Sequence, residues 1–147
     1  MMSAFSREKN PIARAVIPTR VLVVDDEPLI RWSICSALAA HGFDAVAAAD
    51  GLAARRIAAE WPPPRVVLLD RTSSDPACLE VLADIRALYP DCRFVVMTTK
   101  HGVSLRPIFG AGVEQIVKPF DLQQVVRLVT QLAIRDGCQG DAGAPRE

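Results

Sequence analysis

Val21-Leu22-Val23-Val24-Asp25-Asp26-Glu27-Pro28 is the stretch of sequence that decides the fold of this chain. Its four apolar residues form a continuous run, which is typical of a parallel strand buried on both faces, and the run stops at three acids. Pro28 suits the first turn of a helix, where its missing N–H is no loss. Apolar residues then recur at helical spacing as far as Gly42, which favours a helix end: Ile30, Ile34, Ala37 and Leu38. The stretch therefore predicts a strand that leads into a helix of about four turns.

The alternation of a short apolar run with a helical pattern repeats along the chain. Further strands are predicted at 44–48, 66–69, 94–97 and 115–117. Helical faces follow three of these strands, formed by Leu52, Ala53, Ile57 and Ala58, by Leu79, Leu82, Ile85 and Leu88, and by Leu122, Val125, Val126, Val129 and Leu132. Asp50 and Asp121 precede two of the helices and fit N-caps.

The remaining helical segment, 102–111, is the weakest, because Gly102, Pro107 and Gly110 disfavour a helix. The whole alternation is typical of an α/β fold. We expect a doubly wound five-stranded parallel sheet with helices on both faces and an atypical, shortened fourth helix region.

One compact domain accounts for most of the chain. Half of its 147 residues are hydrophobic, which is enough for one core. Residues 1–18 are mixed and polar, and residues 136–147 are rich in Gly, Asp, Pro and Ala. We therefore expect a flexible N-terminal extension at 1–18, a domain at 19–135 and a disordered C-terminal tail at 136–147.

Composition excludes several classes of function. Lysine plus arginine number 17 and aspartate plus glutamate also number 17, so we expect no direct contact with nucleic acid. The cysteines form no Cys-x-x-Cys pair, so they indicate reduced thiols rather than a zinc site: Cys35, Cys78, Cys92 and Cys138. No apolar run approaches the roughly 20 residues that a bilayer span needs, and the N-terminus lacks the apolar core of a signal peptide. We therefore expect a cytoplasmic protein without membrane contact.

Polar residues stand at the carboxyl ends of four predicted strands. Asp25 and Asp26 follow the first strand, Asp70 the third, Thr98 the fourth and Lys118 the fifth. The carboxyl ends of strands in an open parallel sheet border one crevice, where ligands bind. Each residue alone also has a structural explanation: a capped helix start, a loop acid, a strand-end hydroxyl or a solvated lysine. Their joint placement favours one shared site.

Three carboxylates in one crevice predict a bound cation. At about 4 Å and an effective dielectric of about 20, each pair repels by about 4 kcal/mol, so one takes up a proton unless a cation intervenes. Mg²⁺, with Mn²⁺ as an alternative, prefers carboxylate oxygens and keeps several waters for a phosphoryl group. Asp70 would be the nucleophile that forms an aspartyl phosphate, with charge from Lys118 and a hydrogen bond from Thr98.

At this point four motifs together resemble the receiver domain of response regulators. They are Val-Leu-Val-Val-Asp25-Asp26-Glu27-Pro28, Val-Val-Leu-Leu-Asp70, Met97-Thr98 and Val117-Lys118-Pro119-Phe120. Each motif is short, but the four occur in the family's order at the ends of strands, and the likeness covers roughly residues 20 to 134. The resemblance implies a flavodoxin-like sheet with strand order 2-1-3-4-5.

The resemblance also implies roles for the residues of the crevice. Asp26 and Asp70 would bind Mg²⁺ directly, Asp25 through water, and the backbone carbonyl of Thr72 would complete the protein ligands. The phosphoryl group would contact Thr98 and Lys118, and Pro119 is a candidate for a cis peptide bond. The donor would be a phosphohistidine on a sensor histidine kinase or a histidine phosphotransfer protein. Such a signalling receiver catalyses only its own phosphorylation and dephosphorylation.

Two departures from the family pattern concern the output rather than the acceptor. The loop 71–78 lacks the usual Met-Pro pair, and the interval from Thr98 to Lys118 is about two residues short. No aromatic residue stands in the few positions just before Lys118, where many receivers place a switching Tyr or Phe. Gln115 or Ile116 therefore occupies the family's switch position. We expect an altered or absent switch.

Three hypotheses of function remain open from the sequence. The first is a stand-alone receiver that signals by protein contact or phosphorelay, with its downstream protein unknown. The second is a phosphorylation-independent binding module that retains the receiver fold. The third is the receiver part of a longer transcriptional regulator.

Overall fold

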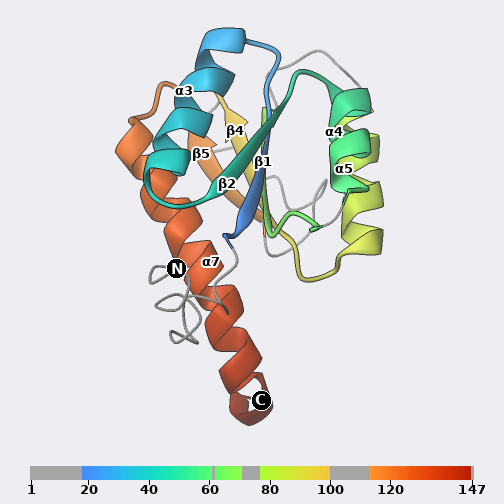
Figure 1. Ribbon diagram of the computed structural model, residues 1–147, viewed down its shortest axis with the longest axis vertical. Coiled ribbons are helices and arrows are strands. Elements are labelled where there is room, and N and C mark those ends of the chain that lie inside the picture. The colour runs from blue at the N-terminus through green and yellow to red at the C-terminus, as the bar shows by residue number, and fades with distance from the viewer. Residues whose placement is uncertain (1–17, 61, 71–76, 100–112, 147) are drawn as a thin grey trace, which may run out of the picture.

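The computed structural model describes residues 18–60, 62–70, 77–99 and 113–146, and Figure 1 shows their arrangement. The predicted helical segment at 102–111 lies outside the described residues. The described residues form five strands and four helices: β1 (Arg20–Val24), α3 (Pro28–Ala40), β2 (Asp44–Ala48), α4 (Gly51–Ala58), β3 (Val66–Asp70), α5 (Ala77–Leu88), β4 (Arg93–Thr98), β5 (Val113–Val117) and α7 (Leu122–Arg146).

All five strands pair in parallel, in the order β2-β1-β3-β4-β5. Helices α3 and α7 cover one face of the sheet, and α4 and α5 cover the other (Figure 1). In register, Val24 pairs with Leu69, Asp70 with Met97, and Thr98 with Val117. The predicted α/β fold and strand order are therefore confirmed, and the carboxyl ends of β1, β3, β4 and β5 lie along one edge of the sheet.

Alternate residues of the strands supply two separate hydrophobic cores. Val21 and Val23 of β1 face α3 and α7, whereas Leu22 and Val24 face α4 and α5. β3 and β4 alternate in the same way, and all these side chains are nearly or fully buried. Because successive residues of a strand point to opposite faces, a strand covered on both sides must be apolar throughout. This explains the continuous apolar runs that end at Asp25 and Asp70.

Capping interactions fix the ends of three helices. At the end of α3, Gly42 has φ of +90°, and the N–H groups of Gly42 and Phe43 donate to the carbonyls of Ala39 and Leu38, which is a Schellman motif. The side chain of Asp50 accepts a hydrogen bond from the Ala53 N–H at the start of α4. The start of α7 carries a reciprocal pair of cap bonds, because the carboxylate of Asp121 accepts from Gln123 N–H and the side chain of Gln124 accepts from Asp121 N–H. The predicted stop and both predicted N-caps are confirmed.

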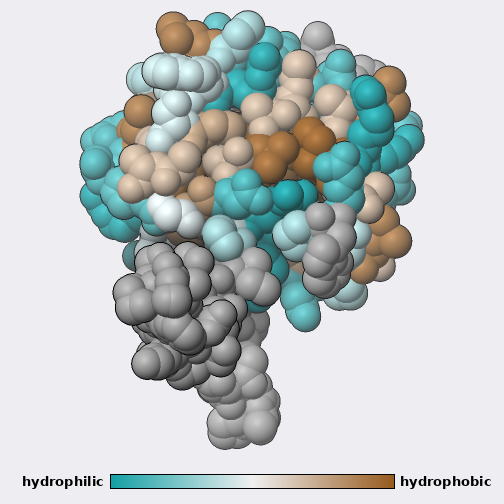
Figure 2. Space-filling view, in the orientation of Figure 1, coloured by the Kyte–Doolittle hydropathy of each residue, from teal (hydrophilic) through white to brown (hydrophobic). Residues whose placement is uncertain are grey.

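Some apolar residues that helical spacing places on inward faces lie at the surface. Leu52 is 62% exposed, Leu88 63% and Leu122 38%. Each stands at or next to the end of its helix, where the helix extends past the residues that it packs against. Figure 2 shows brown side chains among teal ones on the face that it draws. Scattered exposed apolar residues are normal for a folded domain.

The backbone of α7 is helical as far as Arg146, in the segment where composition predicts a disordered tail at 136–147. The first part of α7 packs against α3, and the helix then leads away from the sheet (Figure 1). Once a helix is nucleated, each further residue adds one hydrogen bond, so extension is easier than initiation. This continuation outweighs the low helix propensity of the Gly and Pro residues in the segment.

Candidate functional site

The acid pair lies at the turn between β1 and α3. Asp25 is almost fully buried, and its N–H donates to the carbonyl of Ala48 over 3.1 Å. Its Oδ1 accepts a hydrogen bond of 2.9 Å from the N–H of Glu27, which precedes the helix. Asp26, one residue later, is exposed. The turn therefore holds one carboxylate rigidly and presents the other to solvent.

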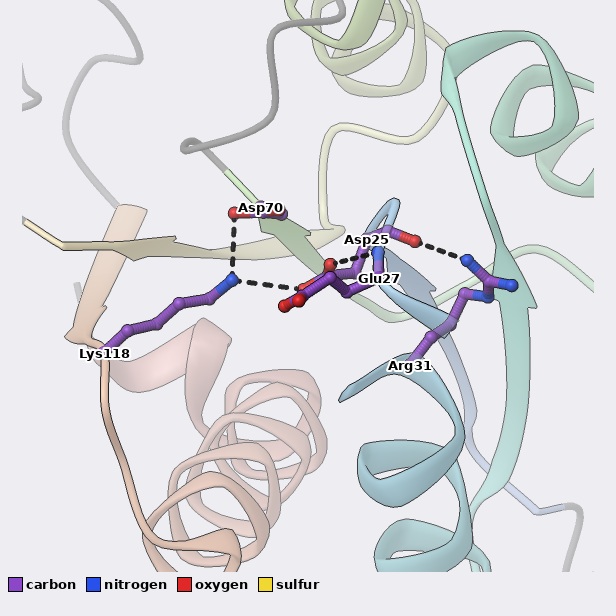
Figure 3. Close-up of polar contacts among 5 residues, drawn as sticks. All are labelled: Asp25, Glu27, Arg31, Asp70 and Lys118. Carbon is purple, nitrogen blue, oxygen red and sulfur yellow. Dashed lines mark hydrogen bonds and ion pairs between the residues drawn. The ribbon is translucent and has the colours of Figure 1, made fainter. Parts of the chain in front are cut away.

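Lys118 joins the acid turn to the end of β3. Asp70 is the last residue of β3 and is 3% exposed, whereas Lys118 directly follows β5. The Nζ of Lys118 lies 3.2 Å from Oδ1 of Asp70 and 3.4 Å from Oδ2 of Asp25, as Figure 3 shows. The N–H of Lys118 also donates to the carbonyl of Thr98 over 2.7 Å, which ties the ends of β4 and β5 together. Residues from four strands thus meet at one point.

Burial and charge shift the pKa values of two of these groups. Burial raises the pKa of Asp25, and the nearby charge of Asp70 adds to the rise, while the hydrogen bond from Glu27 and the charge of Lys118 oppose it. Burial alone would lower the pKa of Lys118, but the carboxylates of Asp25 and Asp70 outweigh it and raise that pKa. Lys118 therefore stays charged at neutral pH, and the carboxyl group of Asp25 holds a proton more readily than an exposed aspartate does.

The carboxylates of Asp25, Asp26 and Asp70 fit a divalent metal ion. One oxygen from each lies within 4.8 Å of the others, so a single ion can contact all three. Lys118 contacts two of these three carboxylates, those of Asp25 and Asp70. Carboxylate oxygens are the ligands that Mg²⁺ and Mn²⁺ prefer. The donor set therefore suits the hard cation that the sequence predicts.

The remaining predicted residues take several positions. Thr98 ends β4, is 6% exposed and lies at the site through its carbonyl bond with Lys118. The peptide bond between Lys118 and Pro119 is cis. Thr72 lies outside the described residues. The structure thus brings together Asp25, Asp26, Asp70 and Lys118, with Thr98 beside them.

The two candidates for the switch position lie on opposite faces of β5. Ile116 is 8% exposed and packs in the core shared with α3 and α7. Gln115 is half-buried and, by strand alternation, shares its face with Val113, which packs toward the core under α4 and α5. Of the two candidates, the side chain that faces away from α7 is therefore the polar Gln115.

A contact by Arg31 was not anticipated from the sequence. Arg31 stands in the first turn of α3, and its guanidinium donates to the backbone carbonyl of Asp25 over 2.7 Å. The only signal in the sequence is that Arg31 follows the acid pair closely, at a spacing that allows the first helical turn to fold back over it. Every residue has a backbone carbonyl, so the identity of residue 25 does not indicate that its carbonyl accepts this hydrogen bond.

A hollow of about 460 Å³ opens beside Lys118, between the start of α3 and the start of α7. Its lining is mainly apolar: Leu29, Ile30, Ser33, Ile34, Thr99, Lys118, Pro119, Phe120 and Leu122. Leu29 is 72% exposed, and the neighbouring Trp32 is 66% exposed. An apolar surface thus borders the charged site.

None of the helices in the described part of the chain combines the length and apolar character that crossing a bilayer requires.

Comparison with known proteins agrees with this geometry. Residues 21–130 match the family described as the response regulator receiver domain. The probable transcriptional regulatory protein TcrX of Mycobacterium tuberculosis is 35% identical over 130 residues, which cover 86% of this chain and 55% of TcrX. The response regulator MprA of a Mycobacterium species is 32% identical over 121 residues, which cover 81% of this chain and 52% of MprA. The chain thus spans about half the length of these curated relatives.

Solved structures show the same fold. The chemotaxis protein CheY4 of Vibrio cholerae superposes with a TM-score of 0.71 at 22% identity, and the match covers 79% of this chain and 99% of CheY4. At this level of identity the likeness concerns the fold alone.

Proposed function

This chain belongs to the response regulator receiver family, and from that premise we propose that Asp70 accepts a phosphoryl group from a phosphohistidine in a Mg²⁺-dependent reaction. The proposed donor is a sensor histidine kinase or a histidine phosphotransfer protein. We further propose that residues 19–135 form the receiver unit and that it works in the cytoplasm. The match of the family to residues 21–130 supports the proposed bounds.

One observation carries the proposal: three carboxylates and one ammonium group meet at the end of the sheet. Oxygens of Asp25, Asp26 and Asp70 lie within 4.8 Å of one another, and Lys118 Nζ contacts two of these side chains. Phosphoryl transfer needs a nucleophile, a metal ion and fixed positive charge around the moving group. The cluster offers a candidate nucleophile in Asp70, carboxylates that would hold the metal ion, and the positive charge of Lys118.

In the proposed reaction, a carboxylate oxygen of Asp70 attacks phosphorus as the P–N bond of phosphohistidine breaks. The electron pair of that bond stays on the imidazole nitrogen, and an acyl phosphate forms on Asp70. Lys118 is held at Asp70 by its 3.2 Å contact and stabilises the charge on the phosphoryl oxygens. The hydroxyl of Thr98, at the end of the adjacent strand, is proposed to donate to the same group.

Asp25, Asp26 and Asp70 would hold Mg²⁺, which would neutralise charge on the phosphoryl oxygens. We propose that Asp26 and Asp70 bind it directly and Asp25 through water, with the carbonyl of Thr72 as a further ligand. The exposure of Asp26 and the burial of Asp25 agree with this division, because the buried carboxylate is already occupied by Glu27 N–H and Lys118.

We propose that the phosphodonor packs against the apolar hollow beside Lys118. A donor protein must bring its phosphohistidine to Asp70, so it must contact the surface next to Lys118 during transfer. Exposed Leu29 and Trp32 extend this apolar surface along α3. Apolar and aromatic residues of this kind commonly anchor transient protein contacts.

Intact-mass measurement after incubation with Mg²⁺ and acetyl phosphate tests the acceptor. Wild type is expected to gain one phosphoryl mass, and the gain is expected to vanish in Asp70→Ala and when EDTA replaces Mg²⁺. Asp91→Ala, which removes an exposed acid from the turn before β4, serves as the matched control and is expected to gain the mass. A wild type that gains no mass, or a gain that persists in Asp70→Ala, contradicts the proposal and favours the phosphorylation-independent binding module.

The output of the phosphorylated protein is also a proposal. We propose signalling through protein contact or phosphorelay, with regulation of transcription as the alternative. The names of relatives such as TcrX, a probable transcriptional regulatory protein, support the alternative. Gln115 in place of an aromatic residue supports an output that does not depend on the usual aromatic switch.

A further inference from the structure

We infer that Arg31 is a positioning residue that holds the Asp25–Asp26 turn in the shape that binds the metal ion. The inference rests on the proposed Mg²⁺ site and assigns part of its geometry to a residue outside the acid cluster. Arg31 reaches the turn through its backbone, because the guanidinium donates to the carbonyl of Asp25 over 2.7 Å.

Arg31 completes a set of contacts that holds Asp25 from every side. The N–H of Asp25 donates to Ala48, its Oδ1 accepts from Glu27, and its Oδ2 accepts from Lys118. The carbonyl of Asp25 is the remaining polar atom, and Arg31 donates to it. In Figure 3, Lys118 and Arg31 approach Asp25 from opposite sides. The carbonyl belongs to the peptide unit that leads into Asp26, so the contact with Arg31 orients the exposed carboxylate as well.

The stability of helix α3 does not explain this placement. Arg31 stands in the first turn of α3, where a cation interacts unfavourably with the helix dipole. That turn contains no acidic residue, and the N-cap residue Glu27 makes no side-chain cap bond. An arginine at this position is unfavourable for the helix dipole, and the hydrogen bond to the carbonyl of Asp25 offsets that electrostatic cost.

Charge and position predict opposite effects on metal binding. Arg31 is a cation near a cation site, so through its charge alone its removal should tighten Mg²⁺ binding. If Arg31 holds the turn, its removal should weaken binding, because the metal must then order the turn itself. The sign of the change therefore separates the two roles.

The experiment is calorimetric titration of Mg²⁺ into wild type, Arg31→Gln, Arg31→Lys and Arg56→Gln, together with thermal melts of the metal-free proteins. Arg56 is exposed on α4, on the opposite face of the sheet, so Arg56→Gln matches the loss of charge. We expect Kd to rise about tenfold in Arg31→Gln, the loss typical of one hydrogen bond from a charged donor. Arg56→Gln should bind as wild type does, and all Tm values should lie within a few degrees of one another.

Arg31→Lys keeps the charge but ends one bond short of the carbonyl, so it should also bind more weakly. It carries the test if Arg31→Gln fails to fold. Unchanged or tighter binding in Arg31→Gln, or wild-type binding in Arg31→Lys, overturns the inference and leaves the proposed site intact. A wild type that binds Mg²⁺ no better than Asp26→Asn overturns the proposed site and the inference with it.

Discussion

Replacement of Lys118 by Met removes an ammonium group that contacts both buried carboxylates. The Lys118 side chain is 14% exposed, and its partners Asp25 and Asp70 are 0% and 3% exposed. Met keeps much of the side-chain length and apolar volume, so the main change is the loss of charge. The folded protein must then accommodate two neighbouring carboxylates without the charge of Lys118.

The size of the effect follows from the two contacts of 3.2 and 3.4 Å. At an effective dielectric of about 20, each attraction is about 5 kcal/mol, but the loss of water by these groups offsets most of it. Removal of one partner of a buried ion pair costs about 3–5 kcal/mol. Asp25 can relieve part of the strain by protonation, since burial already raises its pKa. We therefore expect the free energy of unfolding to fall by about 3 kcal/mol at pH 7.

Urea unfolding in EDTA measures this loss, with Arg56→Met as a control that removes an exposed cation. The control should change the free energy of unfolding by less than about 0.5 kcal/mol. The deficit of Lys118→Met should shrink as the pH falls toward 3.8, the ordinary pKa of Asp25. The raised pKa means that the folded variant takes up a proton on Asp25 at a higher pH than the unfolded chain does. A loss at pH 7 no larger than that of the control would refute the reasoning.

Three further predictions each concern a single residue. Because the pKa of Lys118 is raised above 10.5, its stabilising contribution should be complete below pH 10.5 and be lost as the pH rises through the raised value; urea unfolding of wild type should show this decline, and Lys118→Met should lack it. Gly42→Ala should lower the free energy of unfolding by about 1 kcal/mol, since φ is +90° there and no atom lies within 4 Å of an added Cβ, so an unchanged urea midpoint would contradict the role of backbone strain. Trp32→Ala should slow phosphoryl transfer from a phosphorylated histidine phosphotransfer protein but not from acetyl phosphate, as measured by intact mass over time. Equal slowing with both donors would contradict donor docking at α3.

The ends of the apolar runs predicted most of the site. Asp25 and Asp70 each follow a run that is buried on both faces, and parallel strands bring their carboxyl ends to one edge. The structure confirms that these acids meet there with Lys118. Their roles in metal binding and phosphoryl transfer stay predictions, to be tested by the experiments above.

Helix ends were less predictable than helix positions. Spacing located α4, α5 and α7, but it placed Leu52, Leu88 and Leu122 inward where the structure exposes them. A periodic pattern describes the face of an ideal helix, whereas burial depends on how far the neighbouring elements extend. Composition predicts a disordered tail after residue 135, whereas the backbone of α7 is helical as far as Arg146.

By itself, the sequence determined the fold class, the strand order through family likeness, and the edge of the sheet where the acids gather. These properties follow from local alternation and from the order of residues at strand ends. Only the tertiary structure decided that one ammonium group serves both Asp25 and Asp70, and that Arg31 holds the carbonyl of Asp25. Lys118 and Asp25 are 93 positions apart, so their contact depends on the twist and register of the whole sheet. The contact of Arg31 is with a backbone atom that every residue possesses, and only the path of the turn brings it within reach.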